Sequence, residues 1–250
     1  MIKIKNQQEI LKIRKSCKIL AEIKEIIYNL VRPGISLKEL DQVAFEEILK
    51  RKVKPAFLGY HGFPNSTCLS VNEELIHGIP SNYILKEGDL LKVDMGIIYD
   101  SYYSDSAFTI SVGTQTNTEN NYLINAAKEA FYEGIKAIKP GSRIGDIEDA
   151  IGRYLAKNNL YTPDEFSGHG IGKNLHEDPI VANKGKKNKG PLLKDGMVIC
   201  IEPMIMQDNN DLYIKDDGWT VVCKSGKKSS HYEHTVLIEN GKAIILTEGI

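Results

Sequence analysis

The sequence predicts an α+β fold made of two related halves, with helices covering one face of a sheet. Three observations lead to this prediction. Segments of the first half return about 108 residues later, and each half places helical periodicity before strand-like runs. Of the 250 residues, 42% are hydrophobic and 26% are charged, as is ordinary for a globular protein. We therefore expect one domain over residues 1–250, with halves at about 1–112 and 117–250 joined by the polar stretch TQTNTENN.

The internal repeat rests on three pairs of segments. RPGISLKEL at 32–40 corresponds to KPGSRIGDI at 139–147, and LKEGDLLKVD at 85–94 corresponds to LKDGMVICIE at 193–202. The pairs His61-Gly62 and His169-Gly170 stand 108 residues apart as well. The alternative is that Pro-Gly and Leu-Lys-Gly are common turn motifs that recur by chance. Three matches at nearly one offset favour a repeat.

Apolar residues at steps of three and four predict two helices in each half. In the first half, residues 6–30 present one apolar face made of Ile10, Ile13, Cys17, Leu20, Ile23, Ile27 and Leu30. A second helix begins at Ser36, where Ser36 and Glu39 form a capping box, and its inner face carries Leu37, Leu40, Ala44 and Ile48. In the second half, the corresponding faces carry Leu123, Ala127, Ala130, Phe131, Ile135 and Ile138, and then Ile144, Ile147, Ile151 and Leu155 in a helix that starts near Ser142.

Strand-like apolar runs follow the helices in both halves. They cover 90–98, 106–112, 197–206, 219–224, 233–238 and 242–247. Because helices precede strands instead of alternating with them, the order favours α+β over βαβ units. We expect the two halves to build one sheet, with all helices on one face and a ligand on the open face between the halves.

Charge and cysteine content exclude several classes of protein. The formal net charge of −1 provides no overall field for nucleic acid or anionic membranes. No apolar run approaches a membrane-spanning length, and MIKIKNQQEILKIRK lacks the apolar core of a signal peptide. The four cysteines form no CxxC pair and are expected to be reduced, mostly buried thiols: Cys17, Cys68, Cys200 and Cys223. We expect a cytoplasmic monomer without DNA or membrane partners.

Acidic residues inside or beside apolar strands are the strongest functional signal. Asp94 lies inside LLKVDMGII and Glu202 inside MVICIEPMI, at equivalent positions of the repeat. Glu233 opens EHTVLIE, and a hairpin through DSYYS would return Asp105 beside Asp94. His169 stands among glycines in SGHGIG, which allow close approach of the backbone. A carboxylate buried in an apolar strand costs several kcal/mol unless something compensates its charge.

Clustered buried carboxylates without a nearby arginine imply bound cations. Four carboxylates and one imidazole would balance two divalent ions, and an oxygen-rich set with one nitrogen suits Mn, Fe(II), Co or Zn. The absence of a thiolate argues against a structural zinc. Two such metals activate a bridging water and polarise a scissile carbonyl, which indicates hydrolysis. The alternative is buried salt bridges on ordinary strands, although Lys92 is the only lysine or arginine in the strands that carry these carboxylates.

The segments that carry these residues resemble type I methionine aminopeptidases. The similarity runs in order along nearly the whole chain through VNEELIHGIP, KVDMGIIYDSYYSD, SGHGIGKNLHEDP, DGMVICIEPM and YEHTVLIENG. The resemblance implies the pita-bread fold, in which two halves related by a pseudo-twofold axis form one curved antiparallel sheet covered by helices. It also implies a dinuclear metal site at the centre.

The resemblance assigns a role to each residue of the metal site. Asp94 would bind one ion, His169 and Glu202 the other, and Asp105 and Glu233 would bridge both. Glu202 would also carry a proton from the bridging water to the leaving amine.

Substrate-binding roles follow from the same resemblance. His77 and His176 would act in catalysis by contacting the peptide and stabilising its tetrahedral oxyanion. An apolar pocket for the methionine side chain would consist of Tyr60, Phe63, Cys68 and Trp219. Plain core packing is the alternative for these four, and for Cys68 both interpretations are equally open.

Four positions depart from the pattern of the family. Phe57 replaces a frequent cysteine, Leu175 replaces an aromatic residue, Phe63 lacks a hydroxyl group, and His231 replaces a glutamine. We expect these differences to alter the pocket wall without touching a metal ligand.

The resemblance implies an enzyme that removes the initiator methionine from nascent proteins whose second residue is small. A metal-bridging hydroxide would attack the first peptide bond. A Pro-specific relative of the same fold is the nearest alternative, although those enzymes usually carry an additional N-terminal domain. Type II enzymes need a helical insertion between His176 and Glu202, for which 26 residues leave no room. A non-catalytic binding module of the same fold would be expected to lose metal-ligating residues, and all five of those positions are filled here.

Two lysine-rich segments admit a further partner. NKGKKNKG at 183–190 and KSGKKSS at 224–230 are most simply solvated loops. Their functional interpretation is a weak contact with ribosomal RNA at the ribosome surface, which would suit an enzyme that acts on nascent chains.

Overall fold

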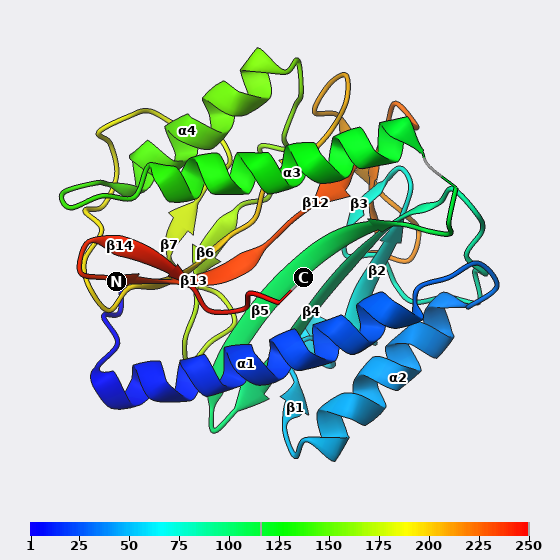
Figure 1. Ribbon diagram of the computed structural model, residues 1–250, viewed down its shortest axis with the longest axis horizontal. Coiled ribbons are helices and arrows are strands. Elements are labelled where there is room, and N and C mark those ends of the chain that lie inside the picture. Colours follow the sequence, from blue (N-terminus) through cyan, green and yellow to red (C-terminus); the bar gives the residue numbers. More distant parts are fainter. Residues whose placement is uncertain (116, 250) are drawn as a thin grey trace.

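Two helices open each half of the chain, and their N-termini show why they begin where they do (Figure 1). The computed structural model describes residues 1–115 and 117–249, so position 116 of the predicted linker lies outside it. Helix α1 (Gln7–Leu30) is capped by Asn6, and α2 (Leu37–Lys50) begins with the predicted capping box. There Glu39 N donates to Ser36 Oγ at 3.2 Å, and Ser36 N donates to Glu39 Oε2 at 2.8 Å.

The helices of the second half match the prediction with shifted starts. Helix α3 (Thr118–Lys136) begins inside the predicted linker because Asn117 caps it by accepting the N–H of Asn120. Helix α4 (Ile144–Lys157) begins two residues after Ser142, since Asp146 caps it by accepting the N–H of Arg143. The four predicted helices are confirmed.

Within the described residues, all strand pairs are antiparallel and form four hydrogen-bonded sheets. The first contains β1 (Lys54–Pro55), β2 (Thr67–Val71), β4 (Leu90–Tyr99) and β5 (Tyr102–Ser111). The second contains β6 (Gly168–Gly170), β7 (Glu177–Val181), β8 (Val198–Ile201), β13 (His234–Glu239) and β14 (Lys242–Ile245). A third sheet contains β3 (Glu74–Ile76), β10 (Leu212–Ile214) and β11 (Val221–Cys223). A fourth contains β9 (Met204–Ile205) and β12 (Ser230–His231).

The expected continuous sheet is therefore interrupted, and the predicted strand 197–206 is two short strands. The first of these, β8, ends just before Glu202 and Pro203, and proline has no N–H to continue a ladder. A pair of backbone hydrogen bonds still joins the two large sheets: Ala107 N donates to Glu233 O at 3.2 Å, and Glu233 N donates to Ala107 O at 3.0 Å. Glu202 and Glu233 thus stand where the strands are broken, at the junction of the halves.

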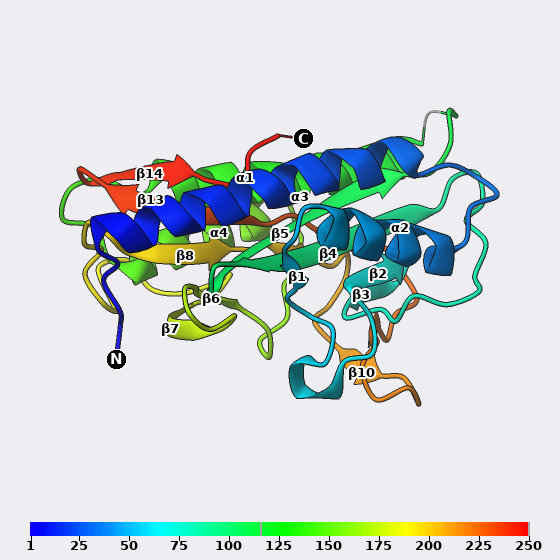
Figure 2. The ribbon, with the colours of Figure 1, turned by 90° about the horizontal axis from the view of Figure 1, so that it is seen from below.

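The four helices lie on one side of the strands, as predicted (Figure 2). The opposite side carries loops, the short 3₁₀ helix η1 (Tyr60–Gly62), β7 and β10. The helices bury their predicted apolar faces, among which those of α2 and α4 are buried completely. No helix within 1–115 and 117–249 has the length and apolar character needed to cross a membrane.

Candidate metal and substrate site

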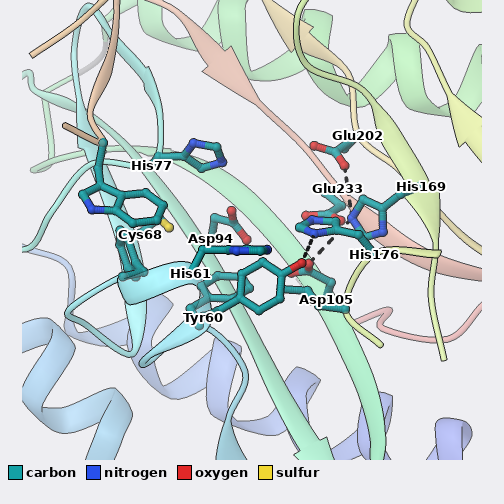
Figure 3. Close-up of a pocket in the computed structure, with 14 residues that line it drawn as sticks. Tyr60, His61, Cys68, His77, Asp94, Asp105, His169, His176, Glu202 and Glu233 are labelled. Carbon is teal, nitrogen blue, oxygen red and sulfur yellow. Dashed lines mark hydrogen bonds and ion pairs between the residues drawn. The ribbon is translucent and has the colours of Figure 1, made fainter. Parts of the chain in front are cut away.

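One cavity of about 280 Å³ brings together every residue that the sequence analysis assigned to the site (Figure 3). The predicted metal ligands lie on one side, and the aromatic residues lie on the other. Three further residues line it as well: Phe57, His61 and Leu175.

The first two carboxylates reach the cavity through the β4–β5 hairpin. Asp94 pairs with Ala107, and Gly96 pairs with Asp105, so Asp94 and Asp105 lie on one face of adjacent strands. The predicted hairpin is confirmed. Asp105 lies inside β5 instead of preceding it, because the turn is shorter than expected and the strand begins at Tyr102.

The second half supplies Glu202 after β8, Glu233 before β13 and His169 within β6. Both glycines beside His169 allow backbone to approach closely: a Cβ would lie 2.3 Å from Cys200 O at Gly168 and 2.1 Å from Asp178 O at Gly170. His169 Nδ1 lies 2.9 Å from Gly170 O, so its Nε2 is the atom that faces the carboxylates. It lies 3.5 Å from Glu202 Oε1 and 3.9 Å from Asp105 Oδ2.

The repeat partner of His169 occupies a different kind of element. His61 lies in η1 with a left-handed φ of 48°, whereas His169 lies in a strand. His61 lines the same cavity from the aromatic side, where its ring packs on Tyr60 with 4.4 Å between centroids.

Burial dominates the electrostatics of the acidic cluster. It raises the pKa of Asp94 to about 6. Burial and the repulsion between neighbouring carboxylates raise the pKa values of Asp105, Glu202 and Glu233 well above their usual range. Burial lowers the pKa of His169 to about 3, so its imidazole is neutral and available as a ligand.

The donor set fits divalent cations. Three buried carboxylate oxygens have no hydrogen-bond partner among the described residues: Asp94 Oδ1, Asp105 Oδ1 and Glu233 Oε1. Asp105, His169 and Glu233 also place ligand atoms within 4.8 Å of one another, together with Cys200 Sγ. Burial and nearby carboxylates raise the pKa of the Cys200 thiol well above its usual range, which disfavours the thiolate that would bind a metal.

Neither Lys92 nor Lys24 supports the alternative that buried salt bridges compensate the charge of the acidic cluster. Lys92 Nζ donates to the backbone oxygens of Asn72, Leu90 and Ser229 instead of to a carboxylate. Lys24, which the sequence analysis missed, is fully buried and donates to Ser106 Oγ at 2.9 Å and Thr247 O at 3.3 Å. Its position between Leu20 and Ile27 on the apolar face of α1 was the signal for its burial.

Aromatic side chains form the other wall of the cavity. The rings of Phe63 and Trp219 meet edge to face at 5.2 Å, and Cys68 lies directly across the strand pair from Asp94. Cys68 is buried and also lines the cavity, so core packing and pocket lining coincide at this position. Phe57 and Leu175 extend the apolar wall, as the departures from the family pattern suggested.

Two histidines present neutral imidazoles between these walls. Tyr60 Oη lies 2.7 Å from His176 Nδ1 in a hydrogen bond that the sequence did not reveal. Burial lowers the pKa of His176 and that of His77, the latter to about 4. His77 has a left-handed φ of 56°, and its ring packs edge-on against Phe166.

One expectation about the unusual positions is wrong. His231 was expected to alter the pocket wall, but it is not among the residues that line the cavity, and its Nε2 lies 3.5 Å from Glu202 Oε2. The short strand β12 turns the imidazole inward, where it is 1% exposed.

Glu177, next to His176, is expected to stabilise the fold only above acid pH. Its side chain is 3% exposed, and it accepts hydrogen bonds from Lys5 Nζ at 2.9 Å and from the backbone N–H groups of Lys173 and Asn174. Burial raises its pKa, but the Lys5 ammonium and these donors outweigh burial and lower it overall. Because the folded pKa is below the unfolded value of about 4.3, the stabilisation is present above that pH and is lost as the pH falls through the folded pKa.

The test is Glu177→Gln in urea unfolding at several pH values, with chelator present. At pH 7 we expect the free energy of unfolding to fall by about 3 kcal/mol, the scale of breaking a buried ion pair. The difference from wild type should begin to narrow below about pH 4.3, the unfolded value, and should close once the pH has fallen below the folded pKa. The exposed Glu25→Gln is the control, and a difference that persists unchanged at acid pH would contradict the electrostatic explanation.

Comparisons with known proteins agree with this geometry. Residues 11–240 match the model of metallopeptidase family M24. A methionine aminopeptidase of Clostridium perfringens is 43% identical over 246 residues, which cover 98% of each chain. The crystal structure of a Thermotoga maritima methionine aminopeptidase has a TM-score of 0.96 at 38% identity, covering 99% of this chain and 100% of that one.

A prolidase from Pyrococcus horikoshii shares the fold at lower similarity. Its TM-score is 0.78 at 25% identity, and the match covers 99% of this chain but 64% of the prolidase. Together these matches confirm the resemblance found in the sequence and, with it, the pita-bread fold. The chain belongs to metallopeptidase family M24.

Proposed function

We propose that this chain is a metal-dependent methionine aminopeptidase, which removes the N-terminal methionine from polypeptides whose second residue is small. The observation that carries the proposal is the cavity itself, in which a buried acidic cluster faces an apolar aromatic wall across two neutral histidines. Similarity over the full length to proteins named methionine aminopeptidase supports the reaction.

The metal ligands would be five residues contributed by both halves of the chain: Asp94, Asp105, His169, Glu202 and Glu233. Their unpartnered oxygens and mutual repulsion support a site for two divalent ions, of which Mn, Fe(II), Co and Zn suit the donors. When bound, such ions lower the pKa of a water ligand and polarise the carbonyl of the scissile bond.

The other groups of the cavity would bind and orient the substrate. The free α-amine would lie beside the acidic cluster, which restricts cleavage to the first peptide bond. The methionine side chain would enter the apolar wall formed by Tyr60, Phe63, Cys68 and Trp219.

The remaining catalytic roles are hydrogen-bond donation to the developing oxyanion and proton transfer to the leaving amine. His77 and His176, both neutral because burial lowers their pKa values, would donate N–H bonds to the oxygen of the scissile carbonyl as its negative charge develops. Glu202, whose pKa is raised by burial, would transfer a proton to the leaving amine.

The organisation and partners of the chain are also proposed. One apolar cluster joins Ile13 and Cys17 of the first half to Val198 and Leu237 of the second, which supports a single catalytic domain. The four cysteines are free and buried, which supports a cytoplasmic location. Nascent polypeptide N-termini would be the substrates, and the chain would act as a monomer.

The lysine-rich loops support a weak ribosome contact only in part. Lys186, Lys187 and Lys189 are exposed, whereas Lys228 is held by Gly88 O and Asn120 Oδ1. Cosedimentation with ribosomes at rising salt would test this contact, and binding that does not weaken with salt would contradict it.

A competition experiment tests the reaction. The protein would be stripped with chelator, restored with Mn, Fe(II) or Co, and offered Met-Ala-Ser, Met-Leu-Ser and Ala-Pro-Ser peptides together. We expect metal-dependent release of methionine from Met-Ala-Ser, with little from Met-Leu-Ser. Release of alanine from Ala-Pro-Ser would indicate the Pro-specific alternative, and no cleavage with any metal would indicate a binding module.

A further inference from the structure

His231 is a buried imidazole that the proposed reaction leaves without a role. It is 1% exposed, and neither Nδ1 nor Nε2 has a hydrogen-bond partner among residues 1–115 and 117–249. A buried polar group without a hydrogen-bond partner destabilises the folded protein, because it loses its bonds to water and gains none in return. The position therefore needs an explanation beyond packing.

The backbone of His231 is held on both sides. Its N–H donates to Thr109 Oγ1 at 3.0 Å, and the Thr109 hydroxyl donates to His231 O at 2.7 Å. His231 also pairs with Met204 between β12 and β9. With the backbone fixed and almost no exposed surface, the imidazole has little freedom to turn toward solvent.

The group that the imidazole faces is the Glu202 carboxylate. His231 Nε2 lies 3.5 Å from Oε2, while His169 Nε2 lies 3.5 Å from Oε1 on the other side. One imidazole thus stands beside each oxygen of Glu202. Of these two histidines, His169 lines the cavity and His231 does not, so His231 approaches the carboxylate from behind.

We propose that His231 is a positioning residue whose Nε2–H donates a hydrogen bond to Glu202 Oε2. This bond holds the carboxylate so that Oε1, beside His169, faces the metal site. Partners of this kind orient ligands and raise their affinity for metal. The inference rests on the proposed function, because it requires Glu202 to bind metal.

Metal affinity measured by calorimetry tests the proposal without relying on activity. Mn(II) would be titrated into metal-free wild type, His231→Leu and His231→Gln, after thermal unfolding confirms that each variant folds. We expect His231→Leu to weaken Mn(II) binding by about 10- to 100-fold, the usual effect of losing such a partner. His231→Gln should stay within about threefold of wild type, because its side-chain amide can still donate.

His61→Leu is the matched control, since within residues 1–115 and 117–249 this cavity imidazole forms no hydrogen bond or ion pair with a predicted ligand, and its Mn(II) affinity should match wild type. Equal affinities of wild type and His231→Leu would overturn the inference. A wild type that binds no metal would instead overturn the proposed function.

A measurement on the wild-type protein covers the case in which His231→Leu does not fold. In ¹⁵N-histidine spectra of the zinc-loaded protein, we expect His231 to carry its proton on Nε2 and to have a bare Nδ1. An Nε2 without a proton would overturn the positioning role, because that nitrogen could then bind metal but could not donate to Glu202.

Discussion

Asp105→Asn is expected to abolish turnover while the protein remains folded. Asp105 would bridge both metal ions, and an amide supplies neither its charge nor its second ligand oxygen. A metal ion stabilises the transition state by several kcal/mol, and about 1.36 kcal/mol corresponds to a tenfold change in rate. We therefore expect kcat to fall about a thousandfold or more. Steady-state kinetics with saturating Mn(II), together with the metal content of the dialysed protein, measure both consequences.

The metal-free fold should survive this change because asparagine has the shape of aspartate and removes one charge from a buried, mutually repelling cluster. Asp89→Asn is a suitable control, since Asp89 is also a buried aspartate, with 7% of its surface exposed, but lies away from the cavity. Its carboxylate accepts hydrogen bonds from Tyr83 Oη, Asn72 Nδ2 and the backbone N–H of Lys86. We expect that control to lose stability and to retain its bound metal. Normal activity of Asp105→Asn would refute the proposed dinuclear site.

His176→Ala is expected to lower kcat by about 10²- to 10³-fold without releasing metal, as found when one oxyanion donor is removed. Tyr60 Oη lies 2.7 Å from Nδ1, and donation from the phenol to this nitrogen would leave the imidazole proton on Nε2, where it faces the substrate. Tyr60→Phe removes this constraint but keeps the imidazole, so its kcat should fall less than that of His176→Ala.

Peptide turnover and metal content distinguish the possible roles of His176. Its ring lies 4.3 Å from that of His169, close enough that a role in metal binding has to be tested. Loss of metal from His176→Ala would make it a ligand, contrary to the proposal. An unchanged kcat would remove it from the catalytic groups.

The sequence predicted elements whose determinants are local. The capping box of Ser36 and Glu39 involves residues three positions apart, and the apolar stripes of the helices repeat within a few turns, so both can be seen in the chain itself. The strands β1, β3, β6, β10 and β12 were missed because two or three residues show no periodicity, and the five-residue strands β2 and β7 were missed as well. Their strand character comes from partners distant in the chain.

The single continuous sheet was overestimated for a related reason. Apolar patterning predicts which residues are buried, but it does not show where a ladder breaks. The break near Glu202 and Pro203, and the placement of Asp105 inside β5, depend on how two segments align across the sheet. Register is set by packing and turn geometry, which one-dimensional patterning describes poorly.

By itself, the sequence determined the helices, the main strands and the acidic residues of the site, since a carboxylate within an apolar run is costly wherever the chain places it. Only the tertiary structure decided which atoms meet. Tyr60 and His176 are 116 residues apart, and Lys24 finds its acceptor on β5. The contact between His231 and Glu202 likewise depends on the pairing of β12 with β9. Burial can be inferred from local pattern, but a hydrogen bond requires two groups within about 3 Å in the correct orientation, and that precision arises only when the whole chain is packed.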